Sequence, residues 1–312
     1  MTEHQANMQE RTMNEVPIPE VRVGQPTRCG ALAVLPLYPE RTLLPDRTCD
    51  YALAHEAIAA GTLIVREVSE EGSVWELMVE NRDKPVLFIE GEEVCGGRQN
   101  RVLCSSTLVA GRSRTHIPVV CTQFGRWEHD KRQFASGSQS PPSLRHVLKE
   151  GRRPDQSRIW TTIRQEHQRL GVQSQSENLS DALTTHRDRV DDLRCRLPYP
   201  RGASGIVVVL GGKVVAADVF DKPSTLKKLW DRLVQGVALD ALEFCGTGCQ
   251  ADDIGKPVRL YKEMVRNMKW RQVDSVGLGE AYRATDDDNS LATALVVDGV
   301  AIHVSVSMPT MG

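Results

Sequence analysis

The chain has 312 residues, of which 40% are hydrophobic and 26% charged, and its formal net charge is −2 at pH 7. This length exceeds the usual size of one hydrophobic core, so we expect one large domain or two tightly joined halves, and we favour two halves. A nearly neutral chain has no general electrostatic attraction to nucleic acid, so nucleic acid is not an expected partner and any anion recognition must be local.

The N-terminal segment is polar and acidic, and it predicts a disordered lead-in over residues 1–28. Met1 to Glu15 lacks the apolar stretch that a secretory signal requires. The best apolar runs, such as Ile206–Leu210, are as short as strands and cannot span a membrane. The eight cysteines are scattered without a Cys-x-x-Cys pair, which argues against a disulfide framework. We therefore expect a cytoplasmic protein that is not bound to a membrane.

A β-rich first half is predicted over residues 29–134. Its first elements are a strand at Gly30–Leu37 and a short helix at Tyr51–Ala60 with Asp50 as the N-cap. Further β-type runs follow, and the first two are typical of a hairpin: Thr62–Val68, Ser73–Val79, Lys84–Glu90, Asn100–Val109 and Thr115–Thr122.

Residues 135–200 predict a polar loop followed by a charged helical insertion. The loop is Ala135–Ser143, and helical patterns cover Ser157–Leu170 and Leu179–Arg196. Basic and acidic side chains are mixed along these helices, which favours a solvated surface over an arm that binds nucleic acid.

A second α+β half is predicted over residues 201–312, packed with the first half as one globular unit. Gly205–Leu210 and Lys213–Phe220 form the clearest hairpin, and Asp221 is the predicted N-cap of the following helix. Another helix at Val258–Met268 and a hairpin of Leu291–Val297 with Val300–Ser307 follow. The predicted fold class is α+β, with a hairpin-based core in two halves and a helical insertion between them.

The segment from Glu90 to Arg101 concentrates the groups that carry chemistry. Glu90 and Glu92 are candidate general acid/base residues. The candidate ligand-binding residues combine glycines that allow close approach, amides that read polar edges, and guanidinium groups that clamp phosphate or carboxylate; they are Gly91, Gly97, Arg98, Gln99, Asn100 and Arg101. The competing interpretation is a charged loop whose side chains pair within the protein.

A second polar and aromatic cluster ends the strand at Thr115–Thr122. Arg126 can complete an anion site with Arg101, and Trp127 can stack on a base. A structural cation–π contact between Arg126 and Trp127 explains the same pair equally well.

Tests for other motifs mostly fail. The chain has no Walker A string, no His-Glu-x-x-His and no Gly-x-Ser-x-Gly, and Gly246–Ala251 fits Gly-x-Gly-x-x-Ala after a helical pattern instead of a strand. Neither Cys104 with His116 and Cys121 nor Asp286–Asp288 has a recognised ligand spacing, so no metal site is predicted and the cofactor is unknown. A Cys95 or Cys121 nucleophile paired with His129 stays open.

The stretch from Pro85 to Trp127 resembles a prokaryotic family, the ARG-and-rhodanese-phosphatase-associated protein domain, formerly described as a domain of unknown function. The resemblance rests on Gly91-Glu92, Gly97–Arg101, Ile117–Val119 with Cys121, and Gly125-Arg126-Trp127, and the Asp218–Phe220 end of a later hairpin is also similar. It implies functional positions at Gly91, Glu92, Gly97, Gln99, Asn100, Arg101, Cys121, Arg126 and Trp127. Gln123 stands where the family often has an acidic residue, and an amide cannot serve as a general base there.

The resemblance also implies a role near ADP-ribose or NAD-derived metabolites, with a functional link to ADP-ribosylglycohydrolase-type enzymes. We expect a protein that acts on or binds an ADP-ribose-like or other phosphorylated, anionic small molecule. The alternative is a non-catalytic module that binds a ligand or a protein, and a purely structural role for the loop is the third hypothesis. The sequence leaves open whether the protein is an enzyme.

Overall fold

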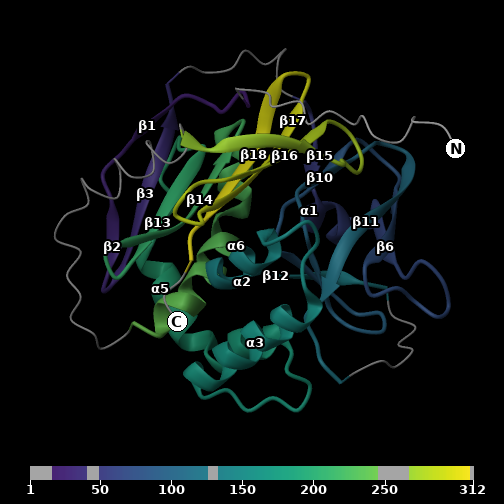
Figure 1. Ribbon diagram of the computed structural model, residues 1–312, viewed down its shortest axis with the longest axis horizontal. Helices are drawn as coiled ribbons and strands as arrows, with labels where there is room; N and C mark the ends of the chain where they lie inside the picture. Colours follow the sequence, from purple (N-terminus) through teal and green to yellow (C-terminus); the bar gives the residue numbers. More distant parts are fainter. Residues whose placement is uncertain (1–15, 41–48, 126–132, 245–266, 310–312) are drawn as a thin grey trace, which may run out of the picture.

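The computed structural model describes residues 16–40, 49–125, 133–244 and 267–309. Strands and helices are both abundant, so the predicted α+β class is confirmed. The strands form a nine-stranded sheet, a six-stranded sheet and a three-stranded sheet, and helices lie between and beside them (Figure 1).

The nine-stranded sheet combines three strands from the first 40 residues with six strands that follow residue 204. Its order is β1-β3-β13-β14-β18-β17-β16-β15, with β2 paired to β3, and every pairing is antiparallel. The strands are β1 (Val21–Val23), β2 (Thr27–Cys29), β3 (Leu32–Pro39), β13 (Gly205–Leu210), β14 (Lys213–Phe220), β15 (Lys269–Val273), β16 (Glu280–Thr285), β17 (Leu291–Val297) and β18 (Val300–Ser307). Both hairpins predicted near the C-terminal end therefore form, because their apolar runs flank short glycine turns.

The two smaller sheets hold the loop that the sequence singled out. The six-stranded sheet has the order β12-β8-β9-β11-β6-β5, and the three-stranded sheet has the order β10-β7-β4. Their strands are β4 (Ala52–Leu53), β5 (Leu63–Arg66), β6 (Glu76–Asn81), β7 (Val86–Phe88), β8 (Glu92–Cys95), β9 (Arg101–Leu103), β10 (Thr107–Val109), β11 (Ser113–Cys121) and β12 (Ala135–Gln139).

Helices connect the sheets. They are α1 (Ala54–Ala59), α2 (Pro142–Lys149), α3 (Gln156–Leu170), α4 (Leu179–Thr185), α5 (Arg187–Arg196) and α6 (Pro223–Leu242). Both α2 and α6 pack on the large sheet, and α6 also contacts β12 of the six-stranded sheet. Gly236 permits this approach, since a Cβ at that position would lie 2.7 Å from the carbonyl oxygen of Gln139.

Several apolar clusters make up the core. One lies between the large sheet and α6, and another lies inside the smaller sheets. On the other face of the large sheet, Leu35 and Val207 share a cluster with Trp270 and Tyr282 from the opposite end of the strand order. The sheet therefore curls around that cluster.

Two predicted helix caps are wrong because tertiary contacts use the side chains elsewhere. Helix α1 begins after Leu53, since Ala52 and Leu53 pair with β7, and the Asp50 carboxylate instead accepts a hydrogen bond from Lys84 at 3.0 Å. Helix α6 begins at Pro223, and the Asp221 carboxylate accepts the hydroxyl of Tyr51. A local cap signal carries no information about such distant partners.

Two predicted elements are divided in the structure. The helical pattern at Leu179–Arg196 forms α4 and α5, which meet at His186. The β pattern at Asn100–Val109 forms β9 and β10, which are separated by Cys104, Ser105 and Ser106 and belong to different sheets. In both cases a periodic pattern continues across a bend that it does not reveal.

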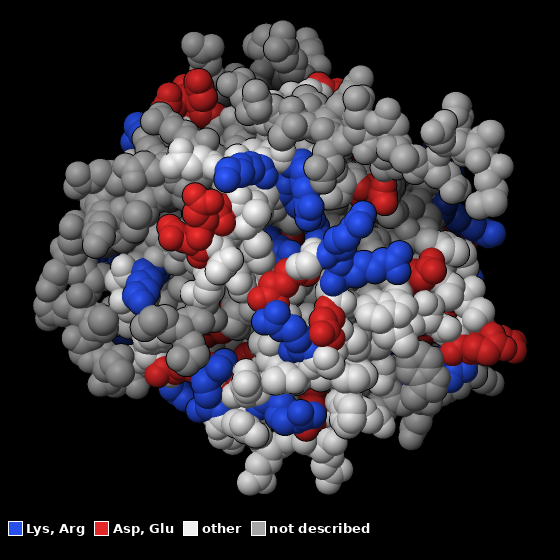
Figure 2. Space-filling model, viewed as in Figure 1, with Lys and Arg blue, Asp and Glu red and all other residues white. Residues whose placement is uncertain are grey.

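The surface shows mixed charge. Lys and Arg side chains surround the middle of the face drawn in Figure 2, with Asp and Glu side chains between them. Among the described residues, no helix combines the length and the apolar character needed to cross a membrane. The predicted helix at Val258–Met268, apart from its last two residues, and the Gly246–Ala251 string lie outside the described residues.

Candidate functional site

Side chains from other segments approach the backbone of the Gly91–Arg101 loop closely, as its glycines predict. Gly91 has φ +80°, and a Cβ there would lie 2.8 Å from Cγ of Arg145 and from Nε2 of Gln139. Gly97 has φ +51°, and a Cβ there would overlap the ring of Phe134 at 2.3 Å. The neighbours at both positions are protein side chains, so these glycines serve packing as the structure stands.

The two arginines of the loop are paired within the protein. The fully buried Arg101 guanidinium donates to the Gln99 carbonyl at 2.8 Å and lies 3.8 Å from the Glu67 carboxylate. The Arg98 backbone N–H donates to the same carboxylate at 2.9 Å, and its side chain donates to the Glu70 carbonyl. A ligand that used either guanidinium would have to replace these contacts.

Glu90 is the acidic centre of a buried polar cluster. Its carboxylate accepts hydrogen bonds from the ammonium of Lys149, from Thr293 at 2.9 Å and from Ser305 at 3.3 Å, and it lies 3.7 Å from Nε of Arg145. These partners come from α2 and from the large sheet. Burial lowers the pKa of Lys149, which the adjacent Glu90 carboxylate opposes.

The same cluster continues to Asp218 on β14. Arg145 donates to both oxygens of the Asp218 carboxylate, one at 2.8 Å, and also to the Ser305 hydroxyl at 2.8 Å. Burial acts to raise the pKa of Asp218, but Arg145 outweighs it and holds the pKa well below its usual range. His303 lies between Asp218 and Ser106, within hydrogen-bond distance of both.

Glu92 has a different environment from Glu90. Its carboxyl group is buried, accepts the backbone N–H of Ile89 at 3.4 Å and lies 3.5 Å from the Arg232 guanidinium on α6. Burial raises its pKa, while Arg232 acts in the opposite direction. The two predicted acid/base residues therefore contact different helices. Glu90 binds Lys149 of α2, whereas Glu92 lies beside Arg232 of α6.

Asn100 connects the loop to the helical insertion. Its side chain donates to Asn178 at 3.1 Å, and its backbone N–H donates to the side-chain oxygen of Gln123 at 3.5 Å. The backbone N–H of Leu179, at the start of α4, donates to the Thr122 carbonyl at 3.1 Å. The loop at Asn100 and the strand end at Thr122 both belong to the predicted site, and both contact the C-terminal end of the α3–α4 connection.

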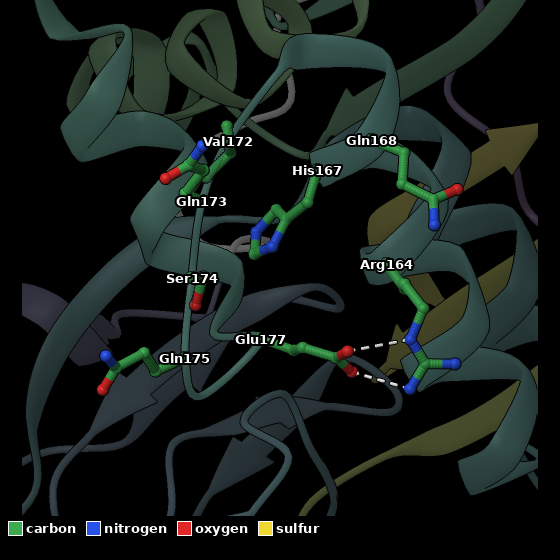
Figure 3. A pocket seen from close by; sticks show the side chains of 8 residues that line it. All are labelled: Arg164, His167, Gln168, Val172, Gln173, Ser174, Gln175 and Glu177. Atoms are coloured by element: carbon green, nitrogen blue, oxygen red, sulfur yellow. Dashed lines mark hydrogen bonds and ion pairs between the residues drawn. The ribbon is translucent and has the colours of Figure 1, made fainter.

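A cavity of about 500 Å³ opens beside that connection, and we call it the α3–α4 cavity. It is lined by Arg164, His167, Gln168, Val172, Gln173, Ser174, Gln175 and Glu177. Figure 3 shows the imidazole of His167 pointing into the space between the Ser174 segment and the ion pair of Arg164 with Glu177. All these residues but Val172 are polar, so the cavity offers many hydrogen-bonding groups.

His167 is a buried wall residue of the cavity. It is 5% exposed, and its Nε2 has no hydrogen-bond partner among the described residues. Burial lowers the pKa of His167, so its imidazole is neutral near pH 7. A buried polar atom without a partner costs folding free energy, and a bound ligand or water at the cavity would recover it.

An aromatic ring, that of Phe124, lies near Arg164, one of the residues that line the cavity. This guanidinium donates to Glu177 at 2.8 and 2.7 Å and lies 5.9 Å from the ring centroid of Phe124. Phe124 is 44% exposed and packs edge-on against Trp160, with ring centroids 5.0 Å apart. The pair Arg126 and Trp127, which the sequence predicts as ligand contacts, lies outside the described residues.

The alternative thiol and metal sites differ in exposure. Cys104 and Cys121 are buried and their thiols have raised pKa values, whereas His116 pairs with Glu76 at 2.8 Å on the surface. His129 lies outside the described residues. Within the described residues, no three His, Cys, Asp or Glu side chains are grouped to hold a metal ion.

Sequence reasoning missed several members of the site. Arg145 and Lys149 lie on a helix whose charges predict exposure, yet both are buried by the large sheet. A signal did exist for Asp218 and His303, since each is a polar residue in the middle of an apolar strand. His167 lies in an amphipathic helix pattern, where a histidine has no special meaning.

Comparisons with known proteins agree with the sequence resemblance. A family model, the ARG and Rhodanese-Phosphatase-superfamily-associated Protein domain, matches residues 20–307. Neither the curated proteins nor the solved structures include a significant match. Because the family model covers nearly the whole chain, the protein belongs to the ARG and Rhodanese-Phosphatase-superfamily-associated Protein domain family.

Proposed function

We propose that the chain binds a phosphorylated small molecule of the ADP-ribose or NAD-derived type in the α3–α4 cavity. The observation that carries this proposal is the buried His167 Nε2, which faces the cavity and has no hydrogen-bond partner among the described residues. A ligand oxygen or ring nitrogen at that position would satisfy the imidazole and remove its desolvation cost.

The size and lining of the cavity suit such a ligand. Ligand pockets commonly measure roughly 300–1,000 Å³, and this one has about 500 Å³. Gln168, Gln173 and Ser174 provide donors and acceptors for ribose hydroxyls or base edges. The exposed Phe124 ring provides a stacking surface for a base close to Arg164.

Arg164 is the proposed contact for phosphate. Its side chain is 43% exposed and already binds the Glu177 carboxylate through two parallel hydrogen bonds. A phosphate group has the same bidentate geometry, so it can take the place of that carboxylate. The family description, which associates this domain with ARG and rhodanese-phosphatase superfamily proteins, supports a ligand of this class.

In this proposal, the predicted residues of the Gly91–Arg101 loop either hold the segments that form the cavity or bind a second part of the ligand. Asn100 holds the α4 end of the cavity through Asn178. Arg98, Gln99 and Arg101, with Arg126 and Trp127, remain proposed ligand contacts. Glu90 and Glu92 are the acid/base residues of the catalytic form of the proposal, in which the bound molecule is also converted.

Calorimetric titration tests the proposal with ADP-ribose, NAD and inorganic phosphate as ligands. Binding of ADP-ribose or NAD should weaken at least about tenfold in His167→Ala and in Arg164→Gln, since each loses a hydrogen bond to the ligand. Arg158→Gln is the matched control, because Arg158 lies on the same helix and pairs with Glu150 away from the cavity. Its affinity should equal that of the unmodified protein.

Two results would overturn the proposal. One is the lack of a measurable binding heat with every ligand, and the other is binding that survives unchanged in His167→Ala. Chromatography of the incubated ligand then separates the two forms. Product that disappears in Glu90→Gln or Glu92→Gln supports catalysis, whereas an intact ligand supports a binding module.

A further inference from the structure

Three side chains that do not line the α3–α4 cavity form a chain of hydrogen bonds. The Ser106 hydroxyl lies 2.6 Å from Nδ1 of His303, and Nε2 of His303 lies 3.1 Å from the Asp218 carboxylate. We infer that Ser106 is a nucleophile toward carboxylic esters, with His303 as its general base and Asp218 as the residue that positions the imidazole. This inference is independent of ligand binding in the α3–α4 cavity.

Arg145 determines which nitrogen of His303 carries the proton. It keeps the Asp218 carboxylate ionised by donating to both of its oxygens. An ionised carboxylate can only accept, so the His303 Nε2 must donate to it. A neutral imidazole then has its lone pair on Nδ1, which faces the Ser106 hydroxyl and can take its proton.

The ring of His303 is also held mechanically. It stacks on Phe220 with centroids 4.6 Å apart and an interplanar angle of 5°. This contact and the hydrogen bond to Asp218 leave the imidazole one orientation, so Nδ1 is already placed for proton transfer.

The Ser106 oxygen has a second contact that leaves its own proton for His303. The backbone N–H of Glu90 donates to Oγ at 3.0 Å, so Oγ accepts one hydrogen bond and uses its own proton toward His303. Ser106 is also the outermost member of the chain, at 9% exposed compared with 1% for both His303 and Asp218.

The reaction step is an acyl transfer. Oγ of Ser106 bonds to the ester carbonyl carbon while its proton passes to Nδ1 of His303. The ester C–O bond breaks, and the leaving alkoxide takes the proton back from His303 as an alcohol. Water then cleaves the acyl-serine with His303 again as base, releasing a carboxylic acid and restoring the hydroxyl.

A structural role for the same contacts predicts no reactivity. Ser106 lies between strands of the smaller sheets, whereas Asp218 and His303 lie on the large sheet, so the chain of hydrogen bonds also joins the sheets. Such a role would make Ser106 important for stability alone. Covalent modification of the folded protein separates the two roles, since it needs an activated hydroxyl.

The test uses the full chain and a fluorophosphonate probe. Its phosphorus atom takes the place of the ester carbonyl carbon and carries fluoride as the leaving group. Oγ attacks phosphorus, fluoride leaves, and His303 holds the proton. Peptide mapping by mass spectrometry should locate the adduct on Ser106 in the unmodified protein. His303→Gln should slow its formation by about 100-fold or more, since a general base is lost. Ser105→Ala is the matched control and should react at the normal rate.

The mapping needs no variant, so a folding defect in Ser106→Ala or His303→Gln cannot obscure it. Circular dichroism establishes which variants are folded, and p-nitrophenyl acetate then tests turnover, with an initial burst expected from the acyl-serine. Folded wild-type protein without an adduct on Ser106 would overturn the inference. An unchanged rate of adduct formation in folded His303→Gln would overturn it as well.

Discussion

The side chain of Asn100 donates a hydrogen bond to the side chain of Asn178 at 3.1 Å, 78 residues along the chain. Asn178 is the residue before α4, and its backbone N–H donates to the Ser174 hydroxyl at 3.3 Å. Ser174 lines the α3–α4 cavity. This contact therefore joins the loop that the sequence singled out to a cavity that appears only in the folded protein.

Replacing Asn100 should destabilise the protein, because it removes contacts that hold the α4 end of the α3–α4 cavity. Asn100→Ala removes the bond to Asn178 and also the bond from the Gly96 backbone N–H to the Asn100 side chain at 3.0 Å. Since both contacts are at least partly buried, we expect a loss of about 1–3 kcal/mol in the free energy of unfolding, measured in urea. Thr184→Ala on the exposed side of α4 should stay within roughly 0.5 kcal/mol; an equal loss there would contradict the prediction.

Removing Arg145 should destabilise the protein strongly. Arg145→Met leaves the buried Asp218 carboxylate without its cation, which typically costs about 3–5 kcal/mol at pH 7. Arg145 lowers the pKa of Asp218, so this pair stabilises the protein above the unfolded pKa of about 4 and less as the pH falls below it.

The loss in Arg145→Met should therefore shrink as the pH is lowered from 7 to 4.5, where the unpaired carboxyl group can take up a proton. Urea unfolding at the two pH values measures this difference. Asp218→Asn, added to Arg145→Met, should recover part of the stability because no buried charge remains. A double variant no more stable than the single variant would show that Asp218 is not the cause.

Glu166 and Asp240 should make the protein less stable as the pH rises. Both are buried; burial raises the pKa of Asp240 to about 6, and burial together with Asp240 raises the pKa of Glu166 well above its usual range. The folded state then binds more protons than the unfolded state, so the stability that these two groups contribute is full below the unfolded pKa of about 4 and falls as the pH rises toward 8. Neither oxygen of Glu166 has a hydrogen-bond partner among the described residues.

Glu166→Gln removes one of these titrating groups. It should raise the melting temperature at pH 8 relative to the unmodified protein and change it little at pH 5, as measured by calorimetry at both values. Asp231→Asn, an exposed position on α6, is the control and should not alter the pH profile. A Glu166→Gln melting curve that is lowered equally at both pH values would contradict the expected titration.

The buried cysteines should resist alkylation. Burial raises the pKa of Cys104 to about 12 and that of Cys121 to about 11, so neither forms the reactive thiolate at pH 8. Cys195 is exposed on α5. Iodoacetamide at pH 8 should modify Cys195 before Cys104 and Cys121, as shown by peptide mapping. Rapid modification of Cys121 in folded protein would contradict this prediction and would support Cys121 as a nucleophile.

Local patterns predicted many of the elements. The hairpins at Gly205–Phe220 and Leu291–Ser307 and the helix at Ser157–Leu170 agree closely with β13–β14, β17–β18 and α3. Alternation, glycine turns and helical spacing act over a few residues, so the chain itself contains this information. The family also followed from a local string, Gly91–Arg101 with the residues near Cys121.

Tertiary structure decided which polar groups meet. The sequence marked Glu90, but its partners Lys149, Thr293 and Ser305 lie 59, 203 and 215 residues away. It marked Arg101 as an anion contact, and folding places that buried guanidinium beside Glu67, a partner that the sequence did not indicate. Which distant strands pair, and which side chains then share a buried space, depends on how the whole chain closes. Local periodicity therefore determined the elements of this protein, and long-range packing determined its sites.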